Sequence, residues 1–392
     1  MSKAGKILVV NPGLHVIAGG QGVTAWVLQT LVDAGYSVSF ATLWEPDFDL
    51  MNTAFTTRIG PDCLRIEIAP ERYRAFIRSF PTRGAALELA LTERFTANLY
   101  RQHHYDLMIG MNNEINFPVS GLQYIHYPRF LPVRARDDYR WFHYIPGFLP
   151  LYRLAARRLS GFSEHTWRSN KSLLNSAYIA SLFDGAGKVL YPPAIGTFRP
   201  QPWVQRKNRF VIVGRLHEGK RIVPMMLILR AVRRLAGIEP FEAVFVGWFN
   251  CSPEYQHDIE ALLKECPWIS LRHDLDRAAL TDLLSSSRFG LHGMHGEHFG
   301  MAVAEMQEAG MIVFAPNSGG PREILCWDQR RLYDSDDDAV AKIAAVLRNP
   351  ALQNEIHGQV EAEAGRFLVE PFCTSFLNAV QQCMPSTAGM KF

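Results

Sequence analysis

The stretch Leu291–Leu325 constrains the fold of this chain more than any other part of the sequence. A loop carries Glu297, and the helical run that follows it holds Glu305 in its second turn. A short apolar run, Met311–Ala315, then ends in the Ser-Gly-Gly-Pro turn Ser318–Pro321. Polar residues and glycines at the ends of apolar runs are typical of the edge where an α/β sheet binds its ligand. We therefore expect a parallel sheet with a site at the carboxyl ends of its strands.

Most of the remaining chain alternates apolar runs with helical runs, which predicts parallel sheets with right-handed crossovers. Strands are predicted at Lys6–Val10, Ser37–Thr42, Leu107–Gly110, Gln123–His126, Leu173–Asn175, Val189–Tyr191, Arg209–Val213, Val244–Gly247, Trp268–Arg272, Phe289–His292 and Met311–Ala315. Helices are predicted at Gln21–Ala34, Gly84–Gln102, Arg277–Ser286, Asp336–Arg348, Asn354–Arg366 and Glu370–Cys383, with further helices from about Ile222 and Gly300. The stretch Glu45–Pro81 is irregular and predicts no element.

A length of 392 residues exceeds one ordinary core and fits two domains. The proline-rich stretch Pro192–Pro202 breaks regular structure and is the predicted linker. We expect an N-terminal acceptor domain at 1–195, a donor domain at 196–368, and a final helix at 369–392.

Composition is that of an ordinary globular protein, with 48% hydrophobic and 20% charged residues. A net charge of +3 gives no argument for nucleic acid as a partner. The six cysteines are scattered, which favours reduced thiols over a disulfide framework or a zinc site. The N-terminal apolar run is too short for a signal peptide, and no run reaches the roughly 18 residues of a membrane span. We expect a cytoplasmic protein, with peripheral contact at the inner membrane face as an open alternative.

Two cations follow the predicted strand Arg209–Val213. Gly214 is followed directly by Arg215 and, five residues later, by Lys220. A guanidinium and an ammonium in a loop before a helix suit a diphosphate. The alternative is an ordinary solvated loop, because surface cations are common.

The first βα turn carries glycines that formally fit a dinucleotide fingerprint, Gly20-x-Gly22-x-x-Ala25, with Glu45 about twenty residues further on. The fingerprint requires a tight turn, whereas some nine residues separate the strand from Gly20. The glycines are equally consistent with a flexible loop that lets a helix start.

The stretch Arg129–Lys171 has nine Lys or Arg residues against three acids. Aromatic residues are interleaved with arginines across Asp137–Ser163. This pattern suits a membrane interface with anionic headgroups, a polyanionic acceptor, or a packed helix with a solvated basic face. The sequence leaves these three readings open.

Two sets of residues have spacings that a metal ion would accept. They are the pairs Asp47-x-Asp49 and Asp274-x-Asp276, and the histidines His292, His295 and His298. We expect no metal at either, because Asp276 is placed to cap the helix that begins at Arg277 and no further oxygen ligands are grouped nearby.

Glu297 and Glu305, separated by seven residues and followed by a Gly-Gly turn, resemble the Glu-x7-Glu motif of the retaining GT-B glycosyltransferases of family 4. This resemblance implies two Rossmann-like α/β domains that face each other across a cleft, with a C-terminal helix crossing back to the first domain. It also implies that the first Glu contacts the sugar of a nucleotide-sugar donor and that the second contacts the ribose.

The resemblance extends from about Tyr124 to Leu325. The strings His292-x-Met294 and Glu297-His298-Phe299-Gly300 are similar to the branch that includes the dolichol-pathway α-1,2-mannosyltransferases, as is the His-Tyr-Pro that begins at His126. In that family a histidine at the position of His126 faces the sugar and the acceptor. The chain differs from the eukaryotic branch in length and in its anchor, so the lipid-linked acceptor is not carried over.

The implied function is retaining, metal-independent transfer of a hexose from GDP-mannose or a UDP-sugar to a glycan, lipid-linked or small-molecule acceptor, without a cofactor. The residues implied to act in catalysis are His126, Arg215, Lys220 and Glu297. The residues implied to bind the donor are Gly19, Gly20, Gly214, Arg215, Lys220, Glu297, His298, Phe299, Gly300, Met301 and Glu305. Two alternatives are a non-catalytic membrane- or polyanion-binding module and another nucleotide enzyme, such as a phosphorylase or an NAD-linked oxidoreductase.

Overall fold

The computed structural model describes residues 5–79, 85–127, 145–183, 187–273 and 275–385. The chain divides into two compact units. The first comprises Met1–Pro192 and Val369–Phe392, and the second comprises Pro193–Leu368. The sequence places these boundaries at 195/196 and 368/369. Each unit is described by itself.

Unit 1 contains a seven-stranded sheet in the order β3-β2-β1-β4-β5-β6-β7, and every pairing in it is parallel. The strands are β1 (Lys6–Val10), β2 (Ser37–Thr42), β3 (Arg65–Ile68), β4 (Leu107–Gly110), β5 (Leu122–Ile125), β6 (Lys171–Leu174) and β7 (Lys188–Val189). The order reverses between β1 and β4, which is the switch point of a doubly wound sheet. Strands β1, β4 and β5 are almost wholly buried, as expected of a sheet covered on both faces.

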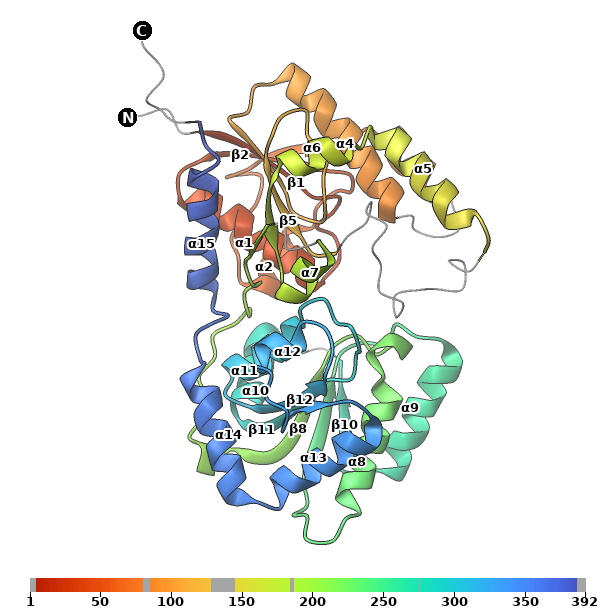
Figure 1. Ribbon diagram of the computed structural model, residues 1–392, viewed down its shortest axis with the longest axis vertical. Helices are drawn as coiled ribbons and strands as arrows, with labels where there is room; N and C mark the ends of the chain where they lie inside the picture. The colour runs from red at the N-terminus through yellow and green to blue at the C-terminus, as the bar shows by residue number, and fades with distance from the viewer. Residues whose placement is uncertain (1–4, 80–84, 128–144, 184–186, 274, 386–392) are drawn as a thin grey trace. The chain divides into compact units, whose positions relative to one another are not determined.

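Helices cover both faces of this sheet (Figure 1). They are α1 (Gly19–Asp33), α2 (Phe48–Phe55), α3 (Glu71–Arg78), α4 (Ala85–Gln102), α5 (Phe148–Ser160), α6 (Glu164–Ser169), α7 (Ala177–Leu182) and α15 (Val369–Gln381). Helix α15 lies beside α1, where Thr30 donates to the Cys373 sulfur at 3.0 Å. The Phe372 ring packs edge-on against Tyr124 of β5, with centroids 6.1 Å apart. The predicted return of the last helix to the first domain is therefore confirmed.

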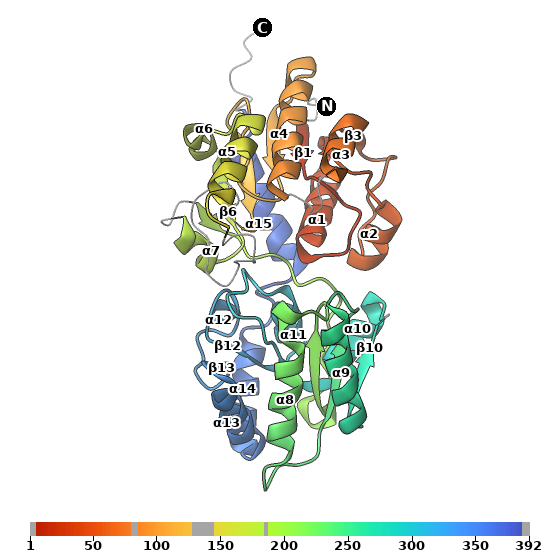
Figure 2. The ribbon, with the colours of Figure 1, turned by 90° about the vertical axis from the view of Figure 1, so that its right-hand side faces the viewer.

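Unit 2 contains a six-stranded parallel sheet in the order β10-β9-β8-β11-β12-β13. The strands are β8 (Lys207–Val213), β9 (Glu242–Val246), β10 (Ile269–Arg272), β11 (Ser287–Leu291), β12 (Ile312–Pro316) and β13 (Leu332–Tyr333). The helices are α8 (Ile222–Arg233), α9 (Pro253–Glu265), α10 (Arg277–Ser285), α11 (Met301–Glu308), α12 (Pro321–Ile324), α13 (Asp336–Leu347) and α14 (Pro350–Ala362). Helices α8 and α9 cover one face, and α11 and α14 cover the other (Figure 1, Figure 2).

Local sequence explains where several helices of unit 2 begin. The side chains of Ser252, Asp276, Ser335 and Asn349 each accept a hydrogen bond from the backbone amide three residues later. Each bond satisfies a donor that the first turn of a helix leaves open. The predicted capping role of Asp276 is confirmed, with 2.7 Å from Ala279 N to its Oδ1.

The stretch Glu45–Pro81 was expected to be irregular, and the structure corrects this. It contains α2, β3 and α3, and Asp47 caps α2 by accepting from Leu50 N at 2.9 Å. The elements are short, so their apolar residues give too few repeats for a clear period.

The helices of the described residues include none that is both long and apolar enough to cross a membrane. All six cysteines are free thiols.

Candidate functional site

Three segments meet at the carboxyl edge of the sheet in unit 2. They follow the neighbouring strands β8, β11 and β12, whose last residues are Val213, Leu291 and Pro316. Carboxyl ends of parallel strands share one edge, so the loops after them lie together. The residues predicted to bind a donor in this half of the chain come from these loops and from the helix after β11.

Lys220, His292 and Glu297 form one group at this edge. The Lys220 ammonium donates to Oε2 of Glu297, and His292 Nε2 lies 3.4 Å from the same oxygen. The side chains are 21%, 6% and 16% exposed, respectively. Lys220 and Glu297, which lie far apart in sequence, are thus in direct contact. The partnership of His292 with Glu297 was not predicted, although His292 stands in the motif that carries the resemblance.

The charge state of this group follows from its contacts. Burial would raise the pKa of the Glu297 carboxyl, but Lys220 and His292 outweigh it and hold that pKa well below its ordinary value. Burial lowers the pKa of His292, and the Glu297 carboxylate only partly opposes this. At neutral pH Glu297 is therefore an anion and His292 is uncharged.

The glycine turn after β12 fixes the loop that carries Glu297. Gly320 N donates to the carbonyl of Glu297 at 2.8 Å, and Gly296 N donates to Ser318 Oγ at 3.0 Å. A Cβ on Gly319 would lie 2.3 Å from the Glu297 carbonyl oxygen, and Gly319 has a φ of +68°. Both the close approach and the left-handed backbone require glycine here.

Glu305 lies in the second turn of α11, as predicted, and it is 6% exposed. Nη1 of Arg277, the first residue of α10, donates to Glu305 Oε1 at 2.9 Å. Burial raises the pKa of Glu305, and Arg277 opposes that rise. The role of Arg277 was not predicted, because no residue near the start of α10 indicates a partner on α11.

The remaining cations of the β8 loop have different surroundings. Arg215 is exposed, and its side chain makes no hydrogen bond or ion pair with another described residue. Arg221 instead makes a bidentate pair with Asp336 at 2.9 Å and lies 3.0 Å from Nε2 of His295. The ammonium of Lys220 and not the guanidinium of Arg215 is thus the cation on Glu297.

The residues between Glu297 and α11 are tightly packed. Phe299 is 3% exposed, and its ring meets Phe367 edge-on with centroids 5.7 Å apart. Gly300 precedes α11 with a φ of +106°, and Met301 is the first helical residue. The backbone amides of the first turn of a helix have no partners within it, so this terminus favours an anion. His298 shares the loop, between Glu297 and Phe299.

The predicted residues of unit 1 gather at the carboxyl edge of its own sheet. Gly19 and Gly20 begin α1, and a Cβ on Gly20 would lie 3.5 Å from His126 Nε2. His126 follows β5, its amide donates to Asn112 O at 3.2 Å, and its carbonyl accepts from Asn175 Nδ2 at 3.2 Å. His126 is half-buried, its ring packs against that of Tyr124 with centroids 5.0 Å apart, and its Nε2 atom is buried.

The loop before Gly20 does not have the geometry of a dinucleotide fingerprint. Strand β1 ends at Val10, α1 begins at Gly19, and a long loop separates them. Asn11 braces that loop, donating to Thr24 Oγ1 at 2.9 Å and accepting from Gly13 N at 3.0 Å. Nothing in this turn favours NAD.

The residues with metal-like spacing have other contacts. Asp47 and Asp276 are helix caps, His292 contacts Glu297, and His295 contacts Arg221. Asp274 lies outside the described residues. Within the described ranges no group of three or more His, Cys, Asp or Glu residues is arranged to hold a metal ion.

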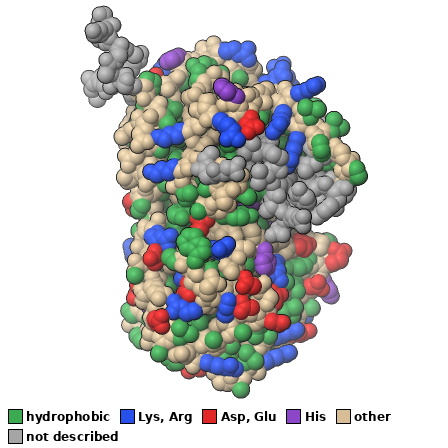
Figure 3. All heavy atoms as spheres, viewed as in Figure 1, with side chains coloured by type: hydrophobic (Ala, Val, Ile, Leu, Met, Phe, Trp, Pro, Cys, Tyr) green, Lys and Arg blue, Asp and Glu red, His purple; other side chains and the backbone are tan. Residues whose placement is uncertain are grey.

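Helix α5 carries the described part of the aromatic and basic stretch, and residues 129–144 lie outside the described residues. Its inner face packs on α4, where Ala156 is fully buried. Its outer face exposes Phe148, Leu151 and Leu154, which are 41%, 68% and 48% exposed. Hydrophobic and basic side chains lie together over this helix in Figure 3.

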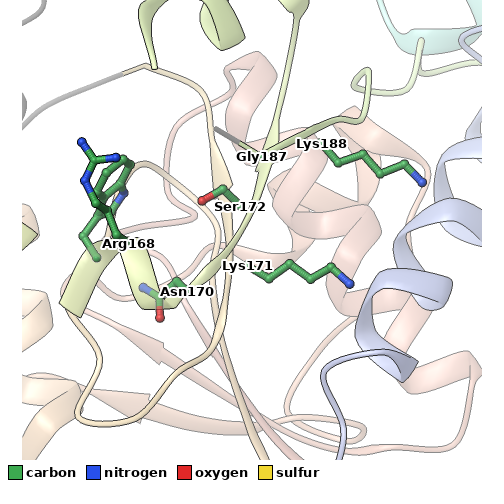
Figure 4. Close-up of a pocket in the computed structure, with 7 residues that line it drawn as sticks. Arg168, Asn170, Lys171, Ser172, Gly187 and Lys188 are labelled. Carbon is green, nitrogen blue, oxygen red and sulfur yellow. The ribbon is translucent and has the colours of Figure 1, made fainter. Parts of the chain in front are cut away.

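A cavity of about 380 Å³ opens at the opposite, amino edge of the sheet in unit 1 (Figure 4). Lys171 and Lys188, the first residues of β6 and β7, line it with Arg168. The two lysines extend to one side and Arg168 to the other. Arg168 pairs with Glu164, so the three cations do not converge on one point.

Part of the chain is similar in sequence to known proteins. Residues 197–361 match the family model Glycosyl transferases group 1. The human GDP-Man:Man(3)GlcNAc(2)-PP-Dol alpha-1,2-mannosyltransferase is 34% identical over 109 residues, which are 26% of this chain and 22% of the relative. The enzyme of the same name from Candida glabrata is 24% identical over 213 residues, 49% of this chain and 38% of the relative. The chain thus spans well under half the length of these curated relatives.

Solved structures resemble nearly the whole chain. Sucrose-phosphate synthase from Thermosynechococcus elongatus superposes with a TM-score of 0.65 at 15% identity, covering 96% of this chain and 98% of that one. At that identity the likeness concerns the fold. The fold is the predicted GT-B type, and the second unit contains a glycosyl transferases group 1 domain.

Proposed function

We propose that this chain is a retaining, metal-independent glycosyltransferase that moves a hexose from a nucleotide diphosphate sugar to an acceptor hydroxyl. The buried group of Lys220, His292 and Glu297 is the observation that carries the proposal. It combines an anion for sugar hydroxyls with a cation for phosphate, and it lies within the matched residues 197–361.

Lys220 is proposed to shift from Glu297 to the diphosphate when the donor binds, and the exposed Arg215 joins it there. The two cations neutralise the charge that grows on the leaving diphosphate, which is the largest electrostatic demand of the step. Glu297, held as an anion, then accepts hydrogen bonds from the sugar hydroxyls. The helix terminus at Gly300 and Met301, with the amides of His298 and Phe299, adds favourable potential for the donor.

Glu305 is proposed to accept from the ribose hydroxyls. His126, in unit 1, is proposed to orient the sugar or the acceptor, with Gly19 and Gly20 allowing close approach of a ligand to the start of α1. Retention is proposed to proceed by attack on the same face as the departing phosphate. The acceptor oxygen bonds to the anomeric carbon while the bond to the phosphate breaks, and the acceptor proton passes to a phosphate oxygen. No metal enters, because Lys220 and Arg215 supply the positive charge.

GDP-mannose is the first candidate donor, because the curated relatives are named for GDP-Man, and a UDP-sugar is the second. The acceptor class is a glycan, a lipid-linked sugar or a small molecule. A cytoplasmic location, with peripheral contact at the inner membrane face, is part of the same proposal.

The test is a thermal-shift screen of the full chain against GDP, UDP and their sugar conjugates, with NADH as the contrasting ligand. We expect one sugar nucleotide to raise the melting temperature and then to release its nucleoside diphosphate in the presence of EDTA. Proton NMR of the product should show the anomeric configuration of the donor. Stabilisation by NADH alone, with no response to any nucleoside diphosphate, would contradict the proposal.

A second candidate function is a non-catalytic module on an anionic membrane, and the outer face of α5 favours it. Exposed apolar side chains three or four residues apart, with Arg158 on the same helix, suit a helix lying in the headgroup layer. Flotation with phosphatidylglycerol vesicles tests the contact. Leu151→Asp should abolish it, whereas Val204→Asp, at an 81% exposed position in unit 2, should not. Flotation without any sugar-nucleotide turnover would favour the module over the enzyme.

A further inference from the structure

The Glu305 carboxylate is paired with Arg277, and the Arg277 guanidinium also donates to a backbone carbonyl. Arg277 Nη1 donates to Glu305 Oε1 at 2.9 Å and also to the carbonyl of Ile195 at 3.2 Å. The Arg277 and Glu305 side chains are 16% and 8% exposed. Ile195 is fully buried in the segment through which the chain enters unit 2. A single nitrogen therefore joins α10, α11 and the entering segment.

The same three residues make a closed arrangement around the carboxylate. The Ile195 carbonyl accepts from Arg277, and the Ile195 backbone amide also favours the charged form of Glu305. Among the described residues, Arg277 is the ionisable group that contributes to the charge state of Glu305. Glu308, one turn further along α11, directs its carboxylate elsewhere, to Gly365 N at 2.7 Å and Phe367 N at 2.8 Å.

Glu308 provides an attachment for α11 that does not involve Arg277. Glu308 accepts hydrogen bonds from the backbone amides of Gly365 and Phe367, which lie in the segment through which the chain leaves unit 2, and no cation takes part. The two crossing segments also pair with each other, since Ala194 N donates to Phe367 O at 2.6 Å. The Glu308 side chain and the Ala194–Phe367 backbone hydrogen bond thus join these segments without Arg277, and the guanidinium of Arg277 adds a charge beside one particular carboxylate.

An ionised carboxylate accepts hydrogen bonds from hydroxyls through both of its oxygens, whereas the protonated form carries an O–H donor and has less acceptor capacity. Burial favours the protonated form of Glu305, and Arg277 is the charge that opposes this. Arg277 also restricts the carboxylate to one orientation, because its planar guanidinium is fixed on the Ile195 carbonyl.

We propose that Arg277 is a positioning residue of the nucleotide site, which holds the Glu305 carboxylate ionised and oriented for the ribose hydroxyls of the donor. The inference rests on the proposed function, in which Glu305 binds the ribose. Arg277 itself need not touch the nucleotide, and its effect on binding passes through Glu305.

The test compares Arg277→Met and Arg277→Lys with the wild type in the full chain. Dissociation constants for GDP and UDP are measured by calorimetry between pH 6 and pH 8. The dissociation constant of each variant is divided by that of the wild type at the same pH. Arg277→Met should bind at least about ten times more weakly at pH 6 and recover much of that loss at pH 8. Arg277→Lys, which keeps the charge, should reduce the pH dependence.

The matched control is Arg209→Met, since Arg209 is also a buried arginine paired with one carboxylate, Glu242, in the same unit. It should bind nucleotide like the wild type at every pH, whatever it costs in stability. The double variant Arg277→Met with Glu305→Gln should lose the pH dependence, because no titrating carboxylate remains.

A ratio for Arg277→Met that does not change with pH would overturn the inference while leaving the proposed function intact. Wild-type affinity in Arg277→Met would overturn it as well. Absence of binding of either nucleotide to the wild type would overturn the proposed function, and the inference with it.

Discussion

The loop that carries Glu297 and the helix that carries Glu305 each hold a glutamate carboxyl, and the pKa values of these two carboxyls are shifted in opposite directions. Both carboxylates are buried and each is paired with one cation. The pKa of Glu297 is nevertheless lowered well below its ordinary value, whereas that of Glu305 is raised. Lys220 and His292 act together on Glu297, whereas burial outweighs the opposing contributions of Arg277 and the Ile195 backbone at Glu305.

The difference in pKa is consistent with different roles for the two carboxyls in the proposed site. Glu297 is a permanent anion in a rigid loop, which suits tight contact with sugar hydroxyls close to the reacting carbon. Burial raises the pKa of Glu305 and Arg277 opposes that rise, so we expect nucleotide binding through Glu305 to depend on Arg277 and on pH. The Glu-x7-Glu motif does not reveal this difference between the two carboxyls, because the pKa of each is set by residues distant in sequence.

The largest expected effect comes from Lys220→Met, which removes the main cation beside Glu297. Turnover should fall about 100-fold or more, because one donor to a developing anion contributes that much to kcat. The fold should lose about 1–3 kcal/mol, because a buried carboxylate is left with less than its full set of partners. Release of nucleoside diphosphate and urea unfolding measure the two effects.

The double variant Lys220→Met with Glu297→Gln separates the two roles of the lysine. It should regain much of the lost stability, because no unpaired charge remains, but none of the turnover. Recovery of turnover in the double variant would mean that Lys220 only neutralises Glu297 and does not act on the diphosphate.

The second largest effect is expected from Gly319→Ala, which disturbs the loop that carries Glu297 and leaves the helix that carries Glu305 unchanged. Gly319→Ala places a Cβ 2.3 Å from the Glu297 carbonyl oxygen at a φ of +68°. We expect a loss of about 2–4 kcal/mol in the free energy of unfolding and a loss of transfer. Nucleotide affinity should survive, because α11 and Arg277 are untouched. Gly358→Ala, where nothing lies within 4 Å of the added Cβ, is the control and should not destabilise the protein.

A smaller effect separates the two acids in binding. Glu305→Gln should raise the dissociation constant for GDP or UDP about tenfold, since a hydrogen bond to a charged acceptor contributes roughly 1.5–3 kcal/mol. Glu297→Gln should leave nucleotide affinity within about twofold while it abolishes transfer of the sugar, because a residue that acts only on the sugar does not change binding of the nucleotide. Calorimetry with nucleoside diphosphate tests both variants, and equal losses of affinity would remove the proposed distinction.

Much of the architecture could be predicted from the sequence. Strands β1 and β4 are near-continuous apolar runs, β2 alternates polar and apolar residues over its first half, and the predicted bounds of all three match the structure. The loop position of Glu297 and the helical position of Glu305 follow from the glycine that precedes α11. Short elements such as β3 and α3 were missed, because four to eight residues do not establish a period.

The partners of the site residues were harder to predict than the residues themselves. The contacts of Glu297 with Lys220 and of Glu305 with Arg277 join segments 77 and 28 residues apart. Only the assembled sheet edge brings such segments together, and the sequence contains no local sign of which cation meets which acid. Arg215 illustrates the limit, since the sequence assigns it and Lys220 to the same diphosphate and does not indicate that only Lys220 contacts Glu297.

The smallest expected effect is also the most direct measure of the contrast between the two acids, because it requires no ligand. A carboxyl with a lowered folded-state pKa stabilises the fold above its unfolded-state pKa, and this contribution disappears as pH falls through the folded value. The stability of wild type relative to Glu297→Gln should therefore rise with pH below the ordinary value of 4.5 and stay constant above it. A carboxyl with a raised folded-state pKa has the opposite sign, since the folded state then binds more protons than the unfolded state between the two values. The stability of wild type relative to Glu305→Gln should therefore fall as pH rises above 4.5 and become constant once the folded pKa is passed. Urea unfolding from pH 3 to pH 8 measures both differences, and slopes of the same sign for the two variants would show that loop and helix do not differ in the way their contacts indicate.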